Sequence, residues 1–357
     1  MFLYLKPFLI ALALVFLFIF LIRHLSAKYN LFGPSVREDR RRIHFGNVSR
    51  FGGVALIFAF LSAIFLSGDI VIEKTHLGLI FASLLLLFYG VWDDLKNLKA
   101  KYQFAFQALA AMILIGAGVR VDYITNPFGG AVRLDQWQVC SDAGGICFSV
   151  LGSLFIFIWL IGMMNVMNWL DGIDGLAAGI GLIGSVILFL LSLNPDVNQP
   201  PLGILAAALA GVLIGFLVFN FHPAKVFLGT SGSIFLGFML GSLAIFSGGK
   251  IATALLIMGL PILDALWVIW QRFKSGSSIF QADKRHLHHK LLESGFSQNQ
   301  IVGLFAFTSG VFAVSALFLQ SRGKIVALLL LLVVVILLAK LSLVLSGLMA
   351  RKSSGET

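Results

Sequence analysis

The sequence predicts an all-α polytopic membrane protein with about eleven transmembrane helices. Hydrophobic residues make up 59% of the 357 positions and charged residues only 12%. Soluble domains contain about 25% charged residues, so an ordinary water-soluble fold is excluded. A disulfide-framework protein is excluded too, because the chain has only two cysteines. The third observation is that the apolar residues form runs near the length that crosses a bilayer, about 17 to 25 residues.

The apolar runs are separated by charged, glycine-rich or proline-containing stretches. The predicted spans are residues 2–22, 51–67, 77–92, 104–118, 149–166, 176–193, 203–219, 232–247, 251–270, 301–319 and 325–348. Charged residues follow the first run directly and it lacks a small-residue cleavage site, so we expect a retained span and not a signal peptide. We expect one transmembrane domain, residues 1–348, and a short cytoplasmic tail, residues 349–357.

Basic residues test the number of spans and orient the chain. Cytoplasmic loops of membrane proteins carry an excess of Lys and Arg, so alternate connections should be basic. One alternate set, which begins with residues 23–50, carries 18 basic residues, whereas the other set carries 7. The N-terminus is therefore predicted to lie outside and the C-terminus in the cytoplasm. The net charge of +10 reports this topology, and we expect no nucleic-acid partner.

The outer connections carry little chemistry. The longest, residues 119–148, contains Cys140 and Cys147, and a disulfide and two free thiols are equally compatible with the sequence. Gly211 and Gly215 form a small-xxx-small pattern, which suits either a homodimer or packing within one chain. Every polar motif that suits catalysis falls instead in the predicted cytoplasmic segments.

The first such motif, VWDDLKNLKAK, lies where the third span leaves the membrane. Asp93 and Asp94 offer hard oxygen ligands that suit Mg²⁺, which often binds one or two carboxylates together with substrate phosphates. Lys101 and its neighbouring lysines can attract an anionic phosphate. The alternative is a solvated loop with a helix N-cap.

The second motif is NVMNWLDGIDGLAAG, which enters the sixth span. A single Asp-Gly pair would indicate only a turn, but two such pairs and two Asn residues between long apolar runs indicate a site, because polar groups are costly there. Its candidates are Asn165, Asn168, Asp171 and Asp174. A third motif, KVFLGTSGS, places hydroxyls and helix-start amides where an anion could bind, or serves helix packing.

Three histidines lie within four residues in the largest cytoplasmic loop, in ADKRHLHHKL. One alternative is that these histidines bind zinc, but no cysteine lies in the cytoplasmic segments and the spacing is poor for a three-histidine zinc site. A basic surface patch is the other alternative. We favour imidazoles that bind a diphosphate or organise a metal site.

Together these stretches resemble the polyprenyl-phosphate N-acetylhexosamine-1-phosphate transferases, which include the WecA and TagO types and the related MraY translocases. The motifs follow the family's order from RRIHFGNVSRFGG to ADKRHLHHKL and fall on one membrane face. The resemblance implies a helical bundle with its active site in a cytoplasmic cleft of a bacterial inner membrane. It also implies that polyprenyl phosphate attacks a UDP-sugar, releasing UMP, with Mg²⁺ or Mn²⁺ as the cofactor.

The resemblance assigns roles residue by residue. It implies catalytic roles for Asp93, Asp94, His286, His288 and His289. It implies substrate binding by Lys101, Asn165, Asp171, Asp174, Arg42, His44 and Arg285, although the two residues near the N-terminus also suit positive-inside anchors. It implies metal binding by Asp94, Asn168 and Thr230. Asp174 matches the position that recognises uracil, whose N3 proton a carboxylate can accept.

The histidine spacing narrows the choice of sugar donor. MraY-type enzymes usually carry three successive histidines, whereas Leu287 interrupts the three here, as in the WecA and TagO branch. The resemblance therefore implies UDP-GlcNAc or a related UDP-HexNAc, and a lipid-linked sugar that starts lipopolysaccharide, teichoic acid or a similar envelope polymer. An MraY-like phospho-MurNAc-pentapeptide transferase remains an alternative.

One departure bears on the metal. The family usually has aspartate where this chain has Thr230, so a neutral hydroxyl replaces a charged metal ligand. We expect a higher Mg²⁺ requirement or a weaker Mg²⁺ dependence. A catalytically impaired member that only binds polyprenyl phosphate or nucleotide sugar is therefore an alternative. A transporter is disfavoured, because transporters place ionisable residues near the bilayer midplane, whereas the acidic residues of the motifs in this chain lie at the predicted cytoplasmic boundary.

Overall fold

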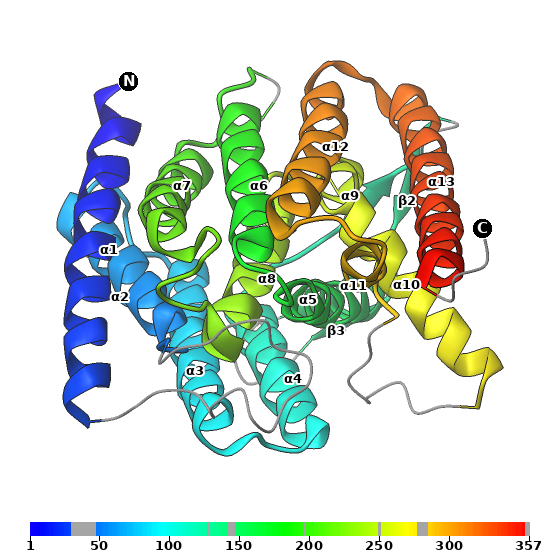
Figure 1. Cartoon of the computed structure of the whole chain (residues 1–357). Helices are drawn as coiled ribbons and strands as arrows, with labels where there is room; N and C mark the ends of the chain where they lie inside the picture. The colour runs from blue at the N-terminus through cyan, green and yellow to red at the C-terminus, as the bar shows by residue number, and fades with distance from the viewer. Residues whose placement is uncertain are drawn as a thin grey trace.

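The computed structural model describes residues 1–29, 48–126, 129–140, 147–195, 197–248, 251–276 and 285–353, and the side chains among them up to residue 345. These residues form a bundle of helices with two small β-hairpins (Figure 1). The helices are α1 Phe2–Tyr29, α2 Gly52–Ser67, α3 Lys74–Lys96, α4 Ala100–Gly116, α5 Val150–Leu170, α6 Leu176–Ser192, α7 Pro200–Asn220, α8 Gly229–Phe246, α9 Ile251–Ile257, α10 Gly259–Lys274, α11 Leu287–Glu293, α12 Gln298–Phe318 and α13 Ser321–Ser353.

Each predicted span coincides with one helix, except the ninth. Seven described helices are long and apolar enough to cross a membrane, and α2, α4 and α6 are shorter apolar helices of 16 or 17 residues. The ninth run, residues 251–270, was predicted as one span, but α9 and α10 meet at an angle of 80°. Gly259 and Pro261 at this break explain the bend, since both residues interrupt a continuous helix. The all-α membrane class is confirmed, whereas the number of crossings and their orientation stay predictions.

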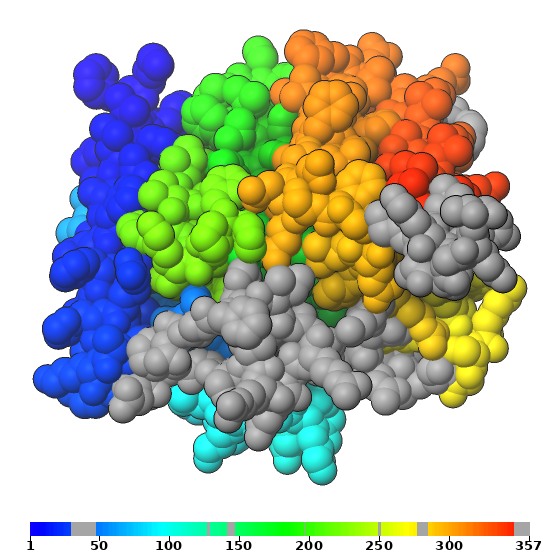
Figure 2. Space-filling view, viewed as in Figure 1, coloured from blue at the N-terminus to red at the C-terminus, as the bar shows by residue number. Residues whose placement is uncertain are grey.

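The bundle is built around α7 and α8. In these two helices 83% of the most apolar stretch is buried, whereas α1 is 22% buried and α13 is 17% buried. The two exposed helices lie on opposite flanks of the molecule in both views, with α6 and α7 between them (Figure 1, Figure 2). The apolar outer faces of α1 and α13 are therefore the surfaces that lipid would cover.

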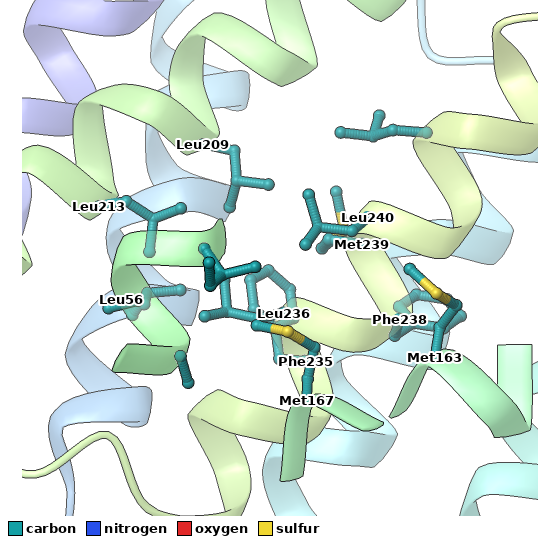
Figure 3. Close-up of a cluster of buried hydrophobic side chains, with 14 of the residues drawn as sticks. Leu56, Met163, Met167, Leu209, Leu213, Phe235, Leu236, Phe238, Met239 and Leu240 are labelled. Atoms are coloured by element: carbon teal, nitrogen blue, oxygen red, sulfur yellow. The ribbon is translucent and has the colours of Figure 1, made fainter. Parts of the chain in front are cut away.

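Apolar side chains of α2, α5 and α7 pack against those of α8 (Figure 3). Phe235 and Leu236 of α8 are fully buried, as are Leu56 of α2, Met167 of α5 and Leu209 of α7. Lipid tails are as apolar as these side chains, so close packing and not water exclusion holds such helices together. This packing keeps the start of α8 in a defined position, which matters for the polar site described below.

The small-xxx-small pattern in α7 packs within the chain. A Cβ on Gly211 would lie 2.4 Å from the carbonyl oxygen of Phe8, and one on Gly215 would lie 2.3 Å from Val15. Both contacts belong to α1, so these glycines allow α1 and α7 to approach closely. Packing within one chain therefore explains the small-xxx-small pattern, and the pattern no longer supports a homodimer.

The long outer connection contains two antiparallel hairpins. β1 Tyr123–Thr125 pairs with β2 Ala131–Arg133, and β3 Gln138–Cys140 pairs with β4 Cys147–Ser149. Cys140 and Cys147 lie directly opposite each other in the second hairpin and form a disulfide. The question that the sequence left open is thus decided in favour of the disulfide, because the strand register brings the two cysteines together.

Candidate active site

Three helix ends meet at the predicted cytoplasmic side of the bundle. They are the last turn of α3, the end of α5 and the first turn of α8. Glycines make this approach possible: a Cβ on Gly90 of α3 would lie 2.2 Å from Cα of Ser231, and one on Gly53 of α2 would lie 2.1 Å from the amide nitrogen of Gly232. Side chains at either position would push α2 or α3 away from α8. Gly90 and Gly53 therefore allow α3 and α2 to approach the KVFLGTSGS motif closely enough for the aspartate pair to contact it.

Backbone hydrogen bonds fix the segment that precedes α2 beside the same site. The amide of Phe227 donates to the carbonyl of Ser49 at 2.9 Å, and the amide of Gly52 donates to the carbonyl of Phe227 at 3.1 Å. Ser49 and Val226 form a parallel β-bridge. These bonds hold Arg50, which lies between them in the chain, at the edge of the polar cavity.

All four oxygens of the aspartate pair accept hydrogen bonds. Asp93 Oδ1 accepts from the amide of Leu98 at 2.9 Å, and Asp93 Oδ2 accepts from the hydroxyl of Thr230 at 2.8 Å. Asp94 Oδ1 accepts from the amide of Thr230 at 2.9 Å, and Asp94 Oδ2 accepts from the hydroxyl of Ser231 at 3.3 Å. The first turn of α8 thus stabilises both carboxylates, as helix-start amides do for anions. The solvated-loop alternative does not describe this pair.

The cavity above the pair has a volume of about 250 Å³ and a strongly polar lining. Its polar and charged lining residues are Arg50, Asp93, Asp94, Asn97, Asn168, Asp171, Asp174, Asn220, Thr230, His289 and Gln298. Asn168 is held by a hydrogen bond from its Nδ2 to Ser233 Oγ at 2.9 Å. The structure therefore brings together the aspartate pair, the Asn-Asp motif, the α8 motif and one histidine, which are far apart in the sequence.

Asp174 is fixed by the connection between α7 and α8. Its Oδ2 accepts hydrogen bonds from Nδ1 of His222 at 3.0 Å and from the amide of Ala224 at 3.0 Å. The neighbouring amide of Gly175 donates to Oδ1 of Asn220 at 3.1 Å. Both contacts order the LDGIDG loop against the end of α7. His222 and Asn220 were not candidates from the sequence, because only the fold brings them to this loop.

The three histidines occupy different environments at the start of α11. His289 lines the cavity, whereas His286 and His288 are buried behind it. The rings of His286 and His288 stack with centroids 5.7 Å apart, and those of His288 and His289 are 4.3 Å apart. Burial lowers the pKa of His288 well below its ordinary value of 6.5, so this imidazole is neutral at pH 7. Neither of its ring nitrogens has a hydrogen-bond partner among the described residues.

Other predicted residues lie outside the cavity. Lys101 is exposed at the start of α4, with its ammonium 5.0 Å from the ring of Tyr102. Arg285 donates to the hydroxyl of Ser275 at 3.2 Å, beside the end of α10. Asn165 faces a second, apolar cavity and bonds to Gln103 and Gln107 of α4.

Two predicted residues near the N-terminus, Arg42 and His44, lie outside the described residues.

Two buried polar residues, Arg50 in the cavity lining and Asp264 outside it, were not among the candidates predicted from the sequence. Arg50 ends the basic stretch that precedes α2; it is 7% exposed, and its Nη2 has no hydrogen-bond partner among the described residues. Asp264 contacts His286. It is also the only acidic residue inside the eleven predicted spans, a position that by itself indicates function. That signal was available from the sequence alone.

The second cavity has a volume of about 460 Å³ and lies between α4, α5 and α10. Its lining is largely apolar, with Phe104, Trp159, Leu266 and Ile269 among its side chains. The last two turns of α5 contribute to both cavities: Asn165 and Trp169 line the apolar one, and Asn168 lines the polar one. An apolar chain and a charged head group could therefore be bound on two sides of the same helix end.

The residues present suit a hard cation that uses few protein ligands. No group of three or more His, Cys, Asp or Glu side chains in the described ranges is arranged to hold a metal ion. Asp94, Asn168 and Thr230, the predicted ligands, do line one cavity and carry only oxygen and amide donors. Mg²⁺ commonly binds one or two carboxylates, several waters and substrate phosphates. The donor chemistry therefore fits Mg²⁺, with one carboxylate fewer than the resembling family has.

The chain is similar to known proteins over most of its length. The model of glycosyl transferase family 4 matches residues 76–248. A probable undecaprenyl-phosphate N-acetylglucosaminyl 1-phosphate transferase of Bacillus subtilis is 28% identical over 81% of this chain and 78% of its own length. A decaprenyl-phosphate N-acetylglucosaminephosphotransferase of Mycobacterium tuberculosis is 32% identical over 80% of this chain and 75% of its own length.

A second group of relatives has names that specify a different sugar. A phospho-N-acetylmuramoyl-pentapeptide-transferase of Prochlorococcus marinus is 30% identical over 76% of this chain and 77% of its own length. The similarity to all these relatives extends over most of their lengths and is not confined to the motifs. The chain therefore belongs to glycosyl transferase family 4, the family of the polyprenyl-phosphate N-acetylhexosamine-1-phosphate transferases that its motifs resemble.

Proposed function

We propose that the protein transfers N-acetylglucosamine-1-phosphate from UDP-GlcNAc to undecaprenyl or a similar polyprenyl phosphate, with Mg²⁺ as the cofactor. The products would be a lipid-diphosphate-sugar and UMP, made at the cytoplasmic face of a bacterial inner membrane. The observation that carries the proposal is the position of the two cavities on either side of the last turns of α5. One cavity suits an isoprenoid chain, and the other suits phosphates and a sugar nucleotide.

The acceptor side follows from the apolar cavity. Its lining of aromatic and aliphatic side chains belongs to helices with exposed apolar side chains, so in a membrane a lipid chain would need no passage through water to enter it. Asn165 sits at the boundary, where its side-chain amide is already bonded to Gln103 and Gln107. We assign it to shaping this boundary, and not to direct contact with the donor.

The donor side follows from the charges of the polar cavity. Arg50 is a buried cation with an unpaired donor nitrogen, and a guanidinium matches the geometry of phosphate oxygens. His289 of α11 lines the same cavity. Asp174 keeps one carboxylate oxygen, Oδ2, in hydrogen bonds with His222 and Ala224, which would hold the side chain ready for a uracil N–H.

The aspartate pair acts on the acceptor phosphate in this proposal. A phosphomonoester has a second pKa near 6 and is mostly a dianion at neutral pH, so its attack needs orientation more than a strong base. Asp93 or Asp94 would orient the lipid phosphate and take any residual proton, and the other would help hold the cation. Bound Mg²⁺ would neutralise charge that develops on the departing UMP.

The test is a transfer assay with purified protein, undecaprenyl phosphate and radiolabelled UDP-GlcNAc. We expect lipid-linked label and UMP in the presence of Mg²⁺, and neither product in EDTA. Asp93→Ala and Asp94→Ala should each abolish most turnover. Asp135→Ala is the matched control, because Asp135 is an exposed-loop aspartate far from the cavity lining that pairs with Arg133. Full turnover of both pair variants in folded protein would refute the roles assigned to them.

Donor competition tests the sugar. UDP-GalNAc and UDP-MurNAc-pentapeptide are offered in the same assay, and we expect UDP-GlcNAc to have the highest kcat/KM. Transfer from UDP-MurNAc-pentapeptide alone would favour the reaction named for the pentapeptide-transferase relatives. UDP-GlcNAc binding without UMP release would favour the impaired member that the Thr230 replacement suggests.

A further inference from the structure

Asp264 is a buried carboxylate that the proposed chemistry does not use. It lies in the second turn of α10 and is 5% exposed. Both of its oxygens are bonded to the start of α11: Oδ2 lies 2.8 Å from Nδ1 of His286, and Oδ1 accepts from the amide of Leu287 at 2.8 Å. A buried carboxylate is costly unless it is paired and hydrogen-bonded, so this arrangement is a specific one.

We infer that Asp264 is a positioning residue of the transferase, which sets the orientation and tautomer of His286 and thereby aligns the histidines of α11. An ionised carboxylate only accepts hydrogen bonds, so Nδ1 of His286 must carry the proton. Nε2 is then the nitrogen that remains to accept a hydrogen bond, or to carry the second proton of the imidazolium. This inference rests on the transfer activity proposed above.

The alignment reaches the polar cavity through packed rings. The ring of Trp169 lies 6.0 Å from that of His286, and the ring of His288 stacks on His286 with an interplanar angle of 12°. His288 in turn contacts His289, which lines the cavity with the aspartate pair. Buried rings at close packing have little freedom to turn, so the orientation of His286 constrains His288. His288 in turn limits the positions open to the partly buried His289.

The two bonds of Asp264 separate two possible roles. The bond to Leu287 satisfies a free amide in the first turn of α11 and would serve stability alone. The bond to His286 acts on an imidazole. Asp264→Asn keeps a carbonyl oxygen that can accept from the amide of Leu287. Its second group is then an uncharged NH₂, which donates a hydrogen bond and cannot accept the proton of Nδ1 of His286. The substitution therefore preserves the helix start while it removes the control over the tautomer.

The experiment is a double-mutant cycle with Asp264→Asn and His286→Gln, carried out in the transfer assay with UDP-GlcNAc. We expect Asp264→Asn to lower kcat by about tenfold or more, as changes in groups that orient a functional histidine do, with little change in KM or in the melting temperature. In the His286→Gln background the same substitution should cost less than about threefold, because the residue it acts through is gone. Asp135→Asn is the matched control and should leave turnover unchanged.

Equal losses in the two backgrounds would overturn the inference, because they would show that Asp264 acts on the fold and not through His286. Full activity of Asp264→Asn would overturn it too. If Asp264→Asn fails to fold, Asp264→Ser takes its place in the cycle, since serine can also accept from Leu287. If the wild type shows no turnover, the proposed function fails. The inference is then judged by the same cycle in UDP-GlcNAc binding measured by calorimetry.

Discussion

Thr230→Asp should increase the affinity of the site for Mg²⁺. Oγ1 of Thr230 lies 2.8 Å from Oδ2 of Asp93, and its amide lies 2.9 Å from Oδ1 of Asp94. A carboxylate at this position would stand beside that of Asp93 and would lose the hydroxyl that now donates to it, while the backbone amide would still donate to Asp94. The present network holds the pair together without a cation, whereas the substituted network would not.

The magnitude follows from the distances. Two unit charges 4 Å apart repel by about 4 kcal/mol at an effective dielectric constant near 20. A divalent cation held by these side chains would offset this repulsion, so the substitution would couple folding to metal binding. If only about a third of the repulsion, roughly 1.4 kcal/mol, is converted into metal affinity, the Mg²⁺ concentration for half-maximal activity falls about tenfold. Without Mg²⁺ the variant should be less stable than the wild type.

The assay is the rate of lipid-linked product as a function of free Mg²⁺, together with melting temperatures in EDTA and in saturating Mg²⁺. Thr230→Asn is the matched control, because Asn has the size of Asp without its charge. We expect Mg²⁺ to raise the melting temperature of Thr230→Asp more than that of Thr230→Asn, as preferential binding to the folded state requires. Identical Mg²⁺ titrations for the two variants would refute the reasoning.

Three further predictions concern the apolar cavity and the histidines. Gly162 lines the apolar cavity and a Cβ there would meet no atom within 4 Å, so Gly162→Leu should occupy the cavity and raise KM for undecaprenyl phosphate much more than for a short isoprenyl phosphate. Gly303→Leu in α12, where a Cβ is equally free, is the control. Gly172→Ala should lower kcat, because its Cβ would lie 2.7 Å from Nε2 of the buried His288; normal turnover would contradict this contact. Burial lowers the pKa of His288, so its contribution to stability is complete above pH 6.5 and is lost as the pH falls. The melting temperature should therefore drop between pH 7 and pH 5, and less so in His288→Gln.

The sequence predicted the residues of the polar cavity better than those of the apolar one. Asp93, Asp94, Asn168 and Asp171 stood out because polar side chains between long apolar runs are rare. The lining of the apolar cavity consists of residue types that occur in every span, so no pattern separated it from lipid-facing or core positions. Its location depends on the 80° bend between α9 and α10, which hydropathy alone does not reveal.

Contacts between distant segments also changed the roles of individual residues. Lys101 was selected because it follows the aspartate pair closely, yet α4 directs it away from the cavity lining. Arg50 ends a basic stretch of the kind that flanks a membrane span, yet the β-bridge between Ser49 and Val226 holds it at the cavity. Proximity in sequence and proximity in space differ most where a chain turns back between helices.

The sequence by itself determined the class of the protein, the place of each apolar helix and the motifs that carry its chemistry. These depend on composition and on local spacing, because a span needs only length and apolarity and a motif needs only residue type. The tertiary structure alone decided the bend of the ninth run, the disulfide, the bonds of Asp93 to Thr230 and of Asp264 to His286. Each of these depends on which helices approach one another, and that is set by close packing of glycines and side chains across the whole bundle.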